Sequence, residues 1–203
     1  MIKIMLFDVD GVLVNGELFS RHLARDHGIT PDTTSPFFTG PFFECLVGQA
    51  DLKQILPSYV QEWGWQHSID DFLSYWFSTY SMNEPLLHII QQLRQQGIPC
   101  YLATNQEQYR TAYILEEMGF AQKFDGIFSS AHVGQVKSQP AFFEHVLRKL
   151  NGIAAHEILF WDDSAPNVAT ARQSGLQAEI YTTFADFTIK MSRYLDQNDA
   201  TLQ

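Results

Sequence analysis

Two aspartates, Asp8 and Asp10, follow a short apolar run near the start of this 203-residue chain. Residues 2–7 are apolar except for Lys3, which predicts a buried strand that ends where the acids begin. Side chains two apart in an extended segment point to the same side, so the two carboxylates are expected to converge, with Gly11 allowing a sharp turn. Close carboxylates repel each other unless a cation or a shared proton intervenes. The pair therefore predicts a cation site or acid–base chemistry, although acidic pairs also occur on ordinary loops.

Two further polar clusters follow predicted strands. Thr104 and Asn105 come directly after residues 99–103, and their side chains can donate hydrogen bonds to phosphate oxygens. The same two residue types also cap helices. Lys137 follows a predicted strand at residues 126–129, where its ammonium could neutralise a phosphate or a carboxylate, or lie in solvent.

The fourth cluster is again acidic. Asp162 and Asp163, followed by Ser164, come after a predicted strand at residues 157–161. Adjacent carboxylates at the end of a strand suit a hard cation such as Mg²⁺. Asp and Ser are also good N-caps for the helix that should follow. Each cluster taken alone has an ordinary structural explanation, but all four share the same placement at strand ends.

The elements that must position these clusters alternate along the chain. Strands are expected at residues 2–7, 99–103, 126–129, 157–161 and 177–181, and helices at residues 84–96, 109–118, 141–150, 166–174 and 184–195. This alternation predicts an α/β fold with a Rossmann-like parallel sheet flanked by helices. Ligands bind such sheets outside the carboxyl ends of the strands, which is where the four clusters should meet.

Residues 15–83 interrupt the alternation. The segment is rich in Phe, Trp and Tyr, shows helical apolar spacing at residues 51–63 and 69–80, and contains no clear strand. Its place directly after the first acidic loop favours a helical cap over the site rather than additional core helices. We therefore expect two domains: an α/β core of residues 1–14 and 84–203, whose polar tail at residues 196–203 should fray, and a helical cap of residues 15–83.

Composition limits the partners that this chain can bind. The formal net charge of −10 argues against nucleic acid and anionic membranes, which are bound by Lys and Arg patches. A phosphate ester would then need a local source of positive charge, which a divalent metal would supply. The first residues do not resemble a signal peptide, no apolar stretch is long enough to cross a bilayer, and Cys45 and Cys100 form no disulfide framework. These features predict a cytoplasmic protein; they give no indication of its oligomeric state.

The four clusters together resemble the motifs of the haloacid dehalogenase superfamily, over residues 2–181. The matching segments are Asp8-Val9-Asp10-Gly11-Val12-Leu13-Val14, Thr104-Asn105, Lys137 and Asp162-Asp163-Ser164-Ala165-Pro166-Asn167-Val168. One departure is that Ser138 and Gln139 separate Lys137 from Pro140, whereas many relatives have proline directly after the lysine. The segment at residues 15–83 resembles the helical cap that some members carry after the first motif.

The resemblance implies a role for each motif residue. Asp8 would be the nucleophile that forms an aspartyl phosphate, and Asp10 the acid and then base. Mg²⁺ would bind the Asp8 carboxylate, the Asp10 backbone carbonyl and Asp163, with Asp162 in reach directly or through water. The phosphate-binding residues would be Thr104, Asn105 and Lys137, Lys137 would also assist catalysis, and Asn167 would support the metal loop. This assignment requires the carboxylates of residues 8, 10 and 163 to meet around one cation.

The resemblance implies a Mg²⁺-dependent phosphatase acting on a small phosphorylated metabolite such as a sugar phosphate. Dehalogenating members lack the second acid of the first motif, so the presence of Asp10 disfavours a dehalogenase. Two alternatives stay open: a phosphomutase of the same superfamily, and a phosphate-responsive signalling domain, whose known examples are shorter and lack a helical insertion. The segment from Asn83 onward is most similar to the branch that contains sugar-phosphate phosphatases and the phosphatase domain of epoxide hydrolases.

Overall fold

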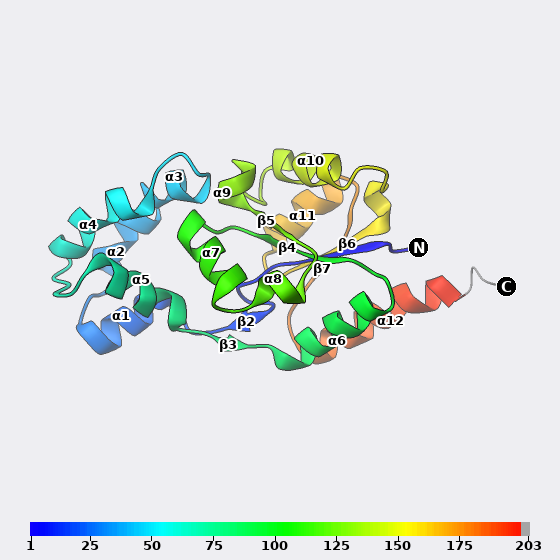
Figure 1. Cartoon of the computed structure of the whole chain (residues 1–203), viewed down its shortest axis with the longest axis horizontal. Coiled ribbons are helices and arrows are strands. Elements are labelled where there is room, and N and C mark those ends of the chain that lie inside the picture. The colour runs from blue at the N-terminus through cyan, green and yellow to red at the C-terminus, as the bar shows by residue number, and fades with distance from the viewer. Residues whose placement is uncertain (200–203) are drawn as a thin grey trace.

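The computed structural model describes residues 1–199, which form a five-stranded sheet with helices on both faces and a helical lobe at one end (Figure 1). In spatial order the strands are β5 (Ile127–Ser129), β4 (Cys100–Thr104), β1 (Ile4–Phe7), β6 (Ile158–Asp162) and β7 (Gln177–Ile180). All neighbouring strands are parallel. The predicted α/β fold with a Rossmann-like sheet is confirmed.

The central strand β1 shows how the sequence builds two apolar layers. Ile4 and Leu6 pack in one buried cluster and Met5 and Phe7 in another, as the two-residue period of a strand requires. Helices α10 (Pro140–Lys149) and α11 (Ala165–Gln173) cover the first cluster. Helices α6 (Glu84–Gln95), α7 (Gln108–Glu116) and α12 (Phe184–Asp199) cover the second. The sheet is therefore buried on both faces. Because its strands are parallel, their carboxyl ends all lie at the same edge.

The core elements begin and end within one or two residues of the predicted bounds, except at α12. This helix runs to Asp199, through the first half of the tail expected to fray; residues 200–203 lie outside the described part of the chain. Three short elements were not predicted: α8 (Phe120–Lys123), α9 (Ser130–Val133) and the 3₁₀ turn η1 (Ala155–Glu157). No helix within residues 1–199 is both long and apolar enough to cross a membrane.

Five helices form the lobe between β1 and α6. They are α1 (Phe19–His27), α2 (Pro31–Phe38), α3 (Phe42–Leu46), α4 (Leu52–Glu62) and α5 (Ile69–Ser78). Their buried faces share one apolar cluster that includes Phe37 and Phe72. Asp51 caps α4 by accepting a hydrogen bond from the Lys53 backbone N–H, and Ser68 caps α5 in a reciprocal box with Asp71.

The expectation that residues 15–83 contain no strand was wrong. Strands β2 (Val14–Asn15) and β3 (Ser81–Met82) pair antiparallel and join the helical lobe to the sheet. Each strand has two residues, too few to produce an alternating pattern in a sequence. The Asn83 side chain supports this link by donating a hydrogen bond to the Val12 carbonyl oxygen at 2.8 Å. The two passages of chain between core and lobe are thereby held side by side.

Candidate active site

Asp8 is the first residue after β1, and its position follows from the sheet. Its backbone N–H donates to the Trp161 carbonyl oxygen at 2.9 Å, which continues the pairing of β1 with β6. The residue is 7% exposed, and its Oδ1 accepts a hydrogen bond from the Val9 backbone N–H at 2.8 Å. Burial raises the pKa of Asp8 to about 7, against the opposing charge of Lys137. The side chain is a desolvated carboxyl fixed at the end of the central strand.

Lys137 is buried between two carboxylates. Its Nζ lies 2.5 Å from Asp8 Oδ1 and 2.7 Å from Asp162 Oδ2, and the side chain is 1% exposed. Burial alone would lower the pKa of this amine, but the two carboxylates outweigh that effect and raise it. The backbone N–H of Lys137 donates to Asn105 Oδ1 at 2.9 Å. Lys137 is therefore a buried, fixed cation, and the ordinary alternative of a solvated surface lysine does not hold.

Three carboxylates meet beside Lys137. One oxygen each from Asp8, Asp162 and Asp163 lies within 4.8 Å of the other two. Asp162 is fully buried; its Oδ1 accepts from the Ser164 backbone N–H at 2.7 Å and its Oδ2 from Lys137. Asp163 is exposed and lines the adjoining cavity. Clustered carboxylate oxygens are the donor set that Mg²⁺ prefers, so these residues fit a hard divalent cation.

Gly11 allows the first acidic loop to lie against the fourth. Its φ of 79° is in the left-handed region, and a Cβ at this position would overlap the Asp163 carboxylate. The turn is closed by a hydrogen bond of 2.9 Å from the Gly11 N–H to the Val14 carbonyl oxygen. Any side chain at residue 11 would require the Asp163 carboxylate or the loop to move from its present position.

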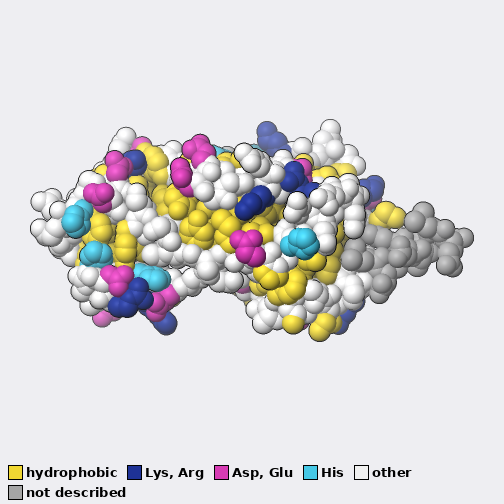
Figure 2. All heavy atoms as spheres, turned by 60° about the horizontal axis from the view of Figure 1, so that its bottom comes forward, with side chains coloured by type: hydrophobic (Ala, Val, Ile, Leu, Met, Phe, Trp, Pro, Cys, Tyr) yellow, Lys and Arg dark blue, Asp and Glu magenta, His cyan; other side chains and the backbone are white. Residues whose placement is uncertain are grey.

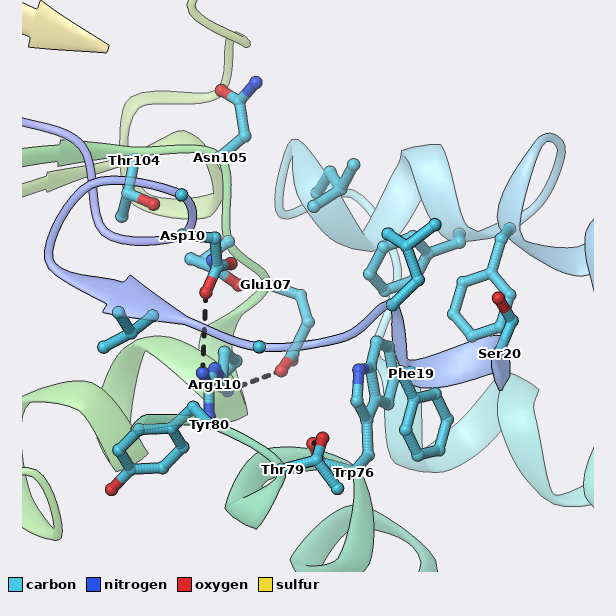
Figure 3. A pocket seen from close by; sticks show the side chains of 18 of the residues that line it. Asp10, Phe19, Ser20, Trp76, Thr79, Tyr80, Thr104, Asn105, Glu107 and Arg110 are labelled. Atoms are coloured by element: carbon cyan, nitrogen blue, oxygen red, sulfur yellow. Dashed lines mark hydrogen bonds and ion pairs between the residues drawn. The ribbon is translucent and has the colours of Figure 1, made fainter. Parts of the chain in front are cut away.

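The Asp10 carboxylate does not join the three-carboxylate cluster. It is 59% exposed, accepts a hydrogen bond from Gln106 Nε2 at 2.5 Å, and lies 3.6 Å from Arg110 Nη2 (Figure 3). The expected convergence of the Asp8 and Asp10 side chains is thus replaced by an arrangement in which they have separate partners. The short isolated bridge between Asp10 and Val14 turns the chain at this point.

Gln106 and Arg110 were not singled out from the sequence. Arg110 is 9% exposed; its Nη1 donates to the Phe77 carbonyl oxygen at the end of α5, so it contacts the lobe and Asp10 together. Buried Glu107 caps α7 by accepting from the Tyr109 and Arg110 backbone N–H groups. Desolvation raises the pKa of Glu107. The sequence feature that could have identified Gln106, Glu107 and Arg110 is their position shortly after the Thr104-Asn105 cluster.

A cavity of about 770 Å³ lies between the sheet edge and the helical lobe. Its polar end is lined by Asp8, Asp10, Thr104, Asn105, Lys137, Asp163 and Asn167, and its far end by lobe residues that include Phe19 and Trp76 (Figure 3). Gly16 and Phe19, which follow the first acidic loop in the sequence, both line the cavity. Trp63 and Trp65 instead pack against the apolar core of the lobe.

Comparison with known proteins agrees with this geometry. The family model described as haloacid dehalogenase-like hydrolase matches residues 2–175. A sesquiterpene phosphatase of Aspergillus oryzae is 37% identical over 89 residues, which cover 43% of this chain and 44% of that protein. A validoxylamine A 7'-phosphate phosphatase of Streptomyces hygroscopicus subsp. limoneus is 24% identical over 200 residues, covering 92% and 88% of the two chains. The chain thus spans less than half the length of the first relative.

A solved structure shows the same fold. A variant of a HAD-family enzyme from Bacteroides thetaiotaomicron, crystallised with magnesium and inorganic phosphate, superimposes with a TM-score of 0.77 at 19% identity. The likeness covers 91% of this chain and 96% of that enzyme, so it includes the helical lobe as well as the sheet.

Proposed function

The chain belongs to the haloacid dehalogenase-like hydrolases, and from this premise we propose that it hydrolyses phosphate monoesters of small molecules with Mg²⁺, through a phosphorylated Asp8. The observation that carries the proposal is the buried Asp8–Lys137 pair at the polar end of a large cavity, beside the Asp8, Asp162 and Asp163 cluster. The phosphatase relatives and the magnesium and phosphate bound by the Bacteroides enzyme support it.

The residues that would hold Mg²⁺ are Asp8, Asp163 and the backbone carbonyl of Asp10. Both Asp162 oxygens already accept hydrogen bonds from the protein, which favours contact with the ion through water and a role in orienting Lys137. When bound, the ion supplies positive charge that neutralises the phosphoryl oxygens. A chain of net charge −10 otherwise has little positive charge to offer a phosphate dianion.

Asp8 and Asp10 carry the covalent steps of the proposal. An Asp8 carboxylate oxygen attacks phosphorus, the bond from phosphorus to the ester oxygen breaks, and Asp10 gives its proton to the departing alkoxide. Asp10 then takes a proton from water as the water oxygen attacks the aspartyl phosphate, which releases inorganic phosphate and regenerates Asp8. The exposure of Asp10 to the cavity suits a group that must reach both the leaving oxygen and the water.

Thr104, Asn105 and Lys137 are proposed to bind the transferring phosphoryl group. All three line the polar end of the cavity. The side-chain oxygen Oδ1 of Asn105 accepts a hydrogen bond from the Lys137 backbone N–H, which leaves the side-chain Nδ2 of Asn105 to donate to phosphate. The Lys137 ammonium offsets the repulsion between the Asp8 carboxylate and the incoming phosphate dianion.

We also propose that residues 15–83 act as a cap that admits small substrates, with residues 1–14 and 84–203 as the catalytic core. Their shared cavity and the contact of Arg110 with both regions support this division. A cap of this kind excludes water and bulky esters from the reacting atoms.

The test is hydrolysis of an activated aryl phosphate by the purified protein, measured as release of inorganic phosphate. We expect turnover with Mg²⁺, none with excess chelator, and at least about a 10³-fold lower kcat for Asp8→Asn, because its amide is not a nucleophile. Undiminished turnover in that variant would exclude the aspartyl phosphate. Transfer to a second hydroxyl without phosphate release would indicate the phosphomutase, and a long-lived phosphoaspartate the signalling domain.

A further inference from the structure

Resting on the proposed phosphatase activity, we propose that the alcohol part of the substrate is uncharged and mainly apolar, and that it packs against an aromatic wall in the cap. The wall consists of Phe19, Phe38, Phe42 and Trp76, all of which line the cavity. The reacting end of the cavity contacts the phosphate that all monoesters share. The wall would therefore select among the alcohols to which the phosphate is attached.

Trp76 is the centre of the wall. The Phe19 ring stacks on it with a centroid distance of 5.2 Å, and the Phe38 ring meets it edge-on at 5.2 Å. Phe42 lies 5.5 Å from Trp76. These four rings come from four different helices and hold each other in place, so the apolar surface exists before any ligand binds. A preformed apolar surface loses little conformational freedom on binding an apolar group.

The wall belongs to the open cavity rather than to the sealed core of the cap. Phe37 and Phe72 are fully buried, whereas Phe19 and Trp76 are half-buried and stand at the cavity in Figure 3. Leu18, which also lines the cavity, is 70% exposed. Figure 2 also shows hydrophobic side chains gathered across the left and middle of the face that it draws. Apolar side chains left exposed beside a catalytic centre indicate a surface that a ligand covers.

The charges around the cavity argue against a substrate with a second anionic group. Among the described lining residues the cations are Lys137 and Arg110. Lys137 is held between Asp8 and Asp162, and Arg110 contacts Asp10 and the Phe77 carbonyl oxygen.

Three further polar side chains of the lining, those of Glu107, Thr34 and Thr79, add no cation. Buried Glu107 would repel an anion. The Thr34 and Thr79 hydroxyls already donate to the carbonyl oxygens of their own helices. A carboxylate or second phosphate on the substrate would therefore lose its water without gaining a cationic partner, which costs free energy.

The experiment measures kcat/KM with Mg²⁺ for ethyl, butyl, hexyl and octyl monophosphate, below micelle concentrations, and for phosphoglycolate as the charged counterpart of ethyl phosphate. Leaving-group basicity changes little along the alkyl series, so a trend reports burial. We expect a rise of about two- to fourfold per added methylene, the range for buried CH₂ groups. We expect ethyl phosphate to exceed phosphoglycolate by roughly tenfold, the cost of one unpaired polar group.

Cap variants locate the effect. Trp76→Ala should flatten the rise with chain length, because it removes the centre of the wall. If this variant folds poorly, Leu18→Asn serves the same purpose at an exposed position and should reduce the rise at the longest chains. Phe43→Ala is the matched control: it also removes a cap aromatic, 46% exposed, but from outside the cavity lining, and should keep the full chain-length dependence.

The outcomes separate the two proposals. A rise that is lost in Trp76→Ala or Leu18→Asn and kept in Phe43→Ala supports an apolar leaving group. Hydrolysis that depends on Mg²⁺ and Asp8 but is indifferent to chain length, or that favours phosphoglycolate, overturns the apolar substrate and leaves the phosphatase intact. Absence of hydrolysis for every ester, including an activated aryl phosphate, overturns the phosphatase and the substrate class with it.

Discussion

The acidic centre and the cap differ in the kind of interaction that holds them. At the centre, Lys137 Nζ contacts Asp8 and Asp162 within 2.7 Å, and each partner has a fixed donor or acceptor. In the cap, rings such as Phe37 and Tyr59 pack with centroids 4.8 Å apart and no direction is imposed beyond ring geometry. Charged hydrogen bonds fix atom positions closely, whereas apolar packing tolerates exchange of side chains with similar volume. This difference suits a centre that determines the reaction and a cap that determines what fits.

The two regions meet at Arg110. Its guanidinium lies 5.3–5.5 Å from the rings of Phe77, Tyr80 and Tyr113, and it also contacts Asp10. A shift of the cap relative to the core would therefore reach the Asp10 carboxylate through one side chain. Other contacts also join cap and core, such as the hydrogen bond from the Tyr109 hydroxyl to Asp51, but Arg110 contacts Asp10 directly.

The largest effect is expected for Lys137→Met. The substitution removes the cation between two buried carboxylates, which should cost about 3–5 kcal/mol of unfolding free energy and lower kcat at least 10²-fold. Urea unfolding and steady-state kinetics measure the two effects. Lys190→Met is the matched control, because Lys190 pairs with Asp186 within one turn of the partly exposed α12 and should cost about 1 kcal/mol or less. A stable and active Lys137→Met would show that the centre does not depend on its charge pairing.

A loss confined to chemistry is expected for Asp10→Asn. Asp10 is largely exposed, so the fold should keep its stability, while kcat for alkyl phosphates falls about 10²–10⁴-fold without the proton donor. Aryl phosphates with acidic leaving groups need little protonation and should lose much less. Kinetics on an alkyl and an aryl ester measure this contrast. Equal losses of kcat for both esters would assign Asp10 a positioning role, and the acidic centre would then have no identified proton donor.

Much of this architecture could be predicted from the sequence because the signals are local. Alternating strands and helices require a parallel sheet, and parallel strands end at one edge, which places Asp8, Thr104 and Asp162 together without knowledge of the packing. The burial of Lys137 could not be predicted, since it depends on two carboxylates that come from other strand ends.

The orientation of Asp10 was missed for a related reason. Its partner Gln106 follows β4, and its partner Arg110 also contacts Phe77 of the cap, so both contacts join segments far apart in the chain. Strands β2 and β3 were missed because two residues give no periodicity. Local patterns therefore predicted the elements and their order, and long-range packing decided which side chains became partners.

An effect confined to the cap is expected for Phe72→Ala. Phe72 is fully buried and meets Phe19 and Trp65 edge-on, with centroid distances of 5.5 and 5.2 Å. Its truncation should cost about 3–5 kcal/mol within the cap. Hydrogen-exchange mass spectrometry should show lost protection across residues 15–83 and retained protection in β1 and β6. Phe43→Ala, at an exposed position in the same lobe, should change neither. Equal loss in the sheet would show that cap and core unfold as one unit.

The smallest effect is a pH dependence at the centre of the metal-free protein. The pKa of Asp8 is raised to about 7 from an ordinary value near 3.8, mainly by burial, so between these values the folded chain holds a proton that the unfolded chain releases. This contribution to stability is complete below pH 3.8 and is lost as the pH rises through 7, with a slope of at most about 1.4 kcal/mol per pH unit. Urea unfolding in chelator at pH 5–8 measures it, with Asp8→Asn as the variant that cannot titrate. Wild type should lose stability relative to Asp8→Asn as the pH rises. A constant difference in unfolding free energy between the two proteins would place the Asp8 pKa outside this range.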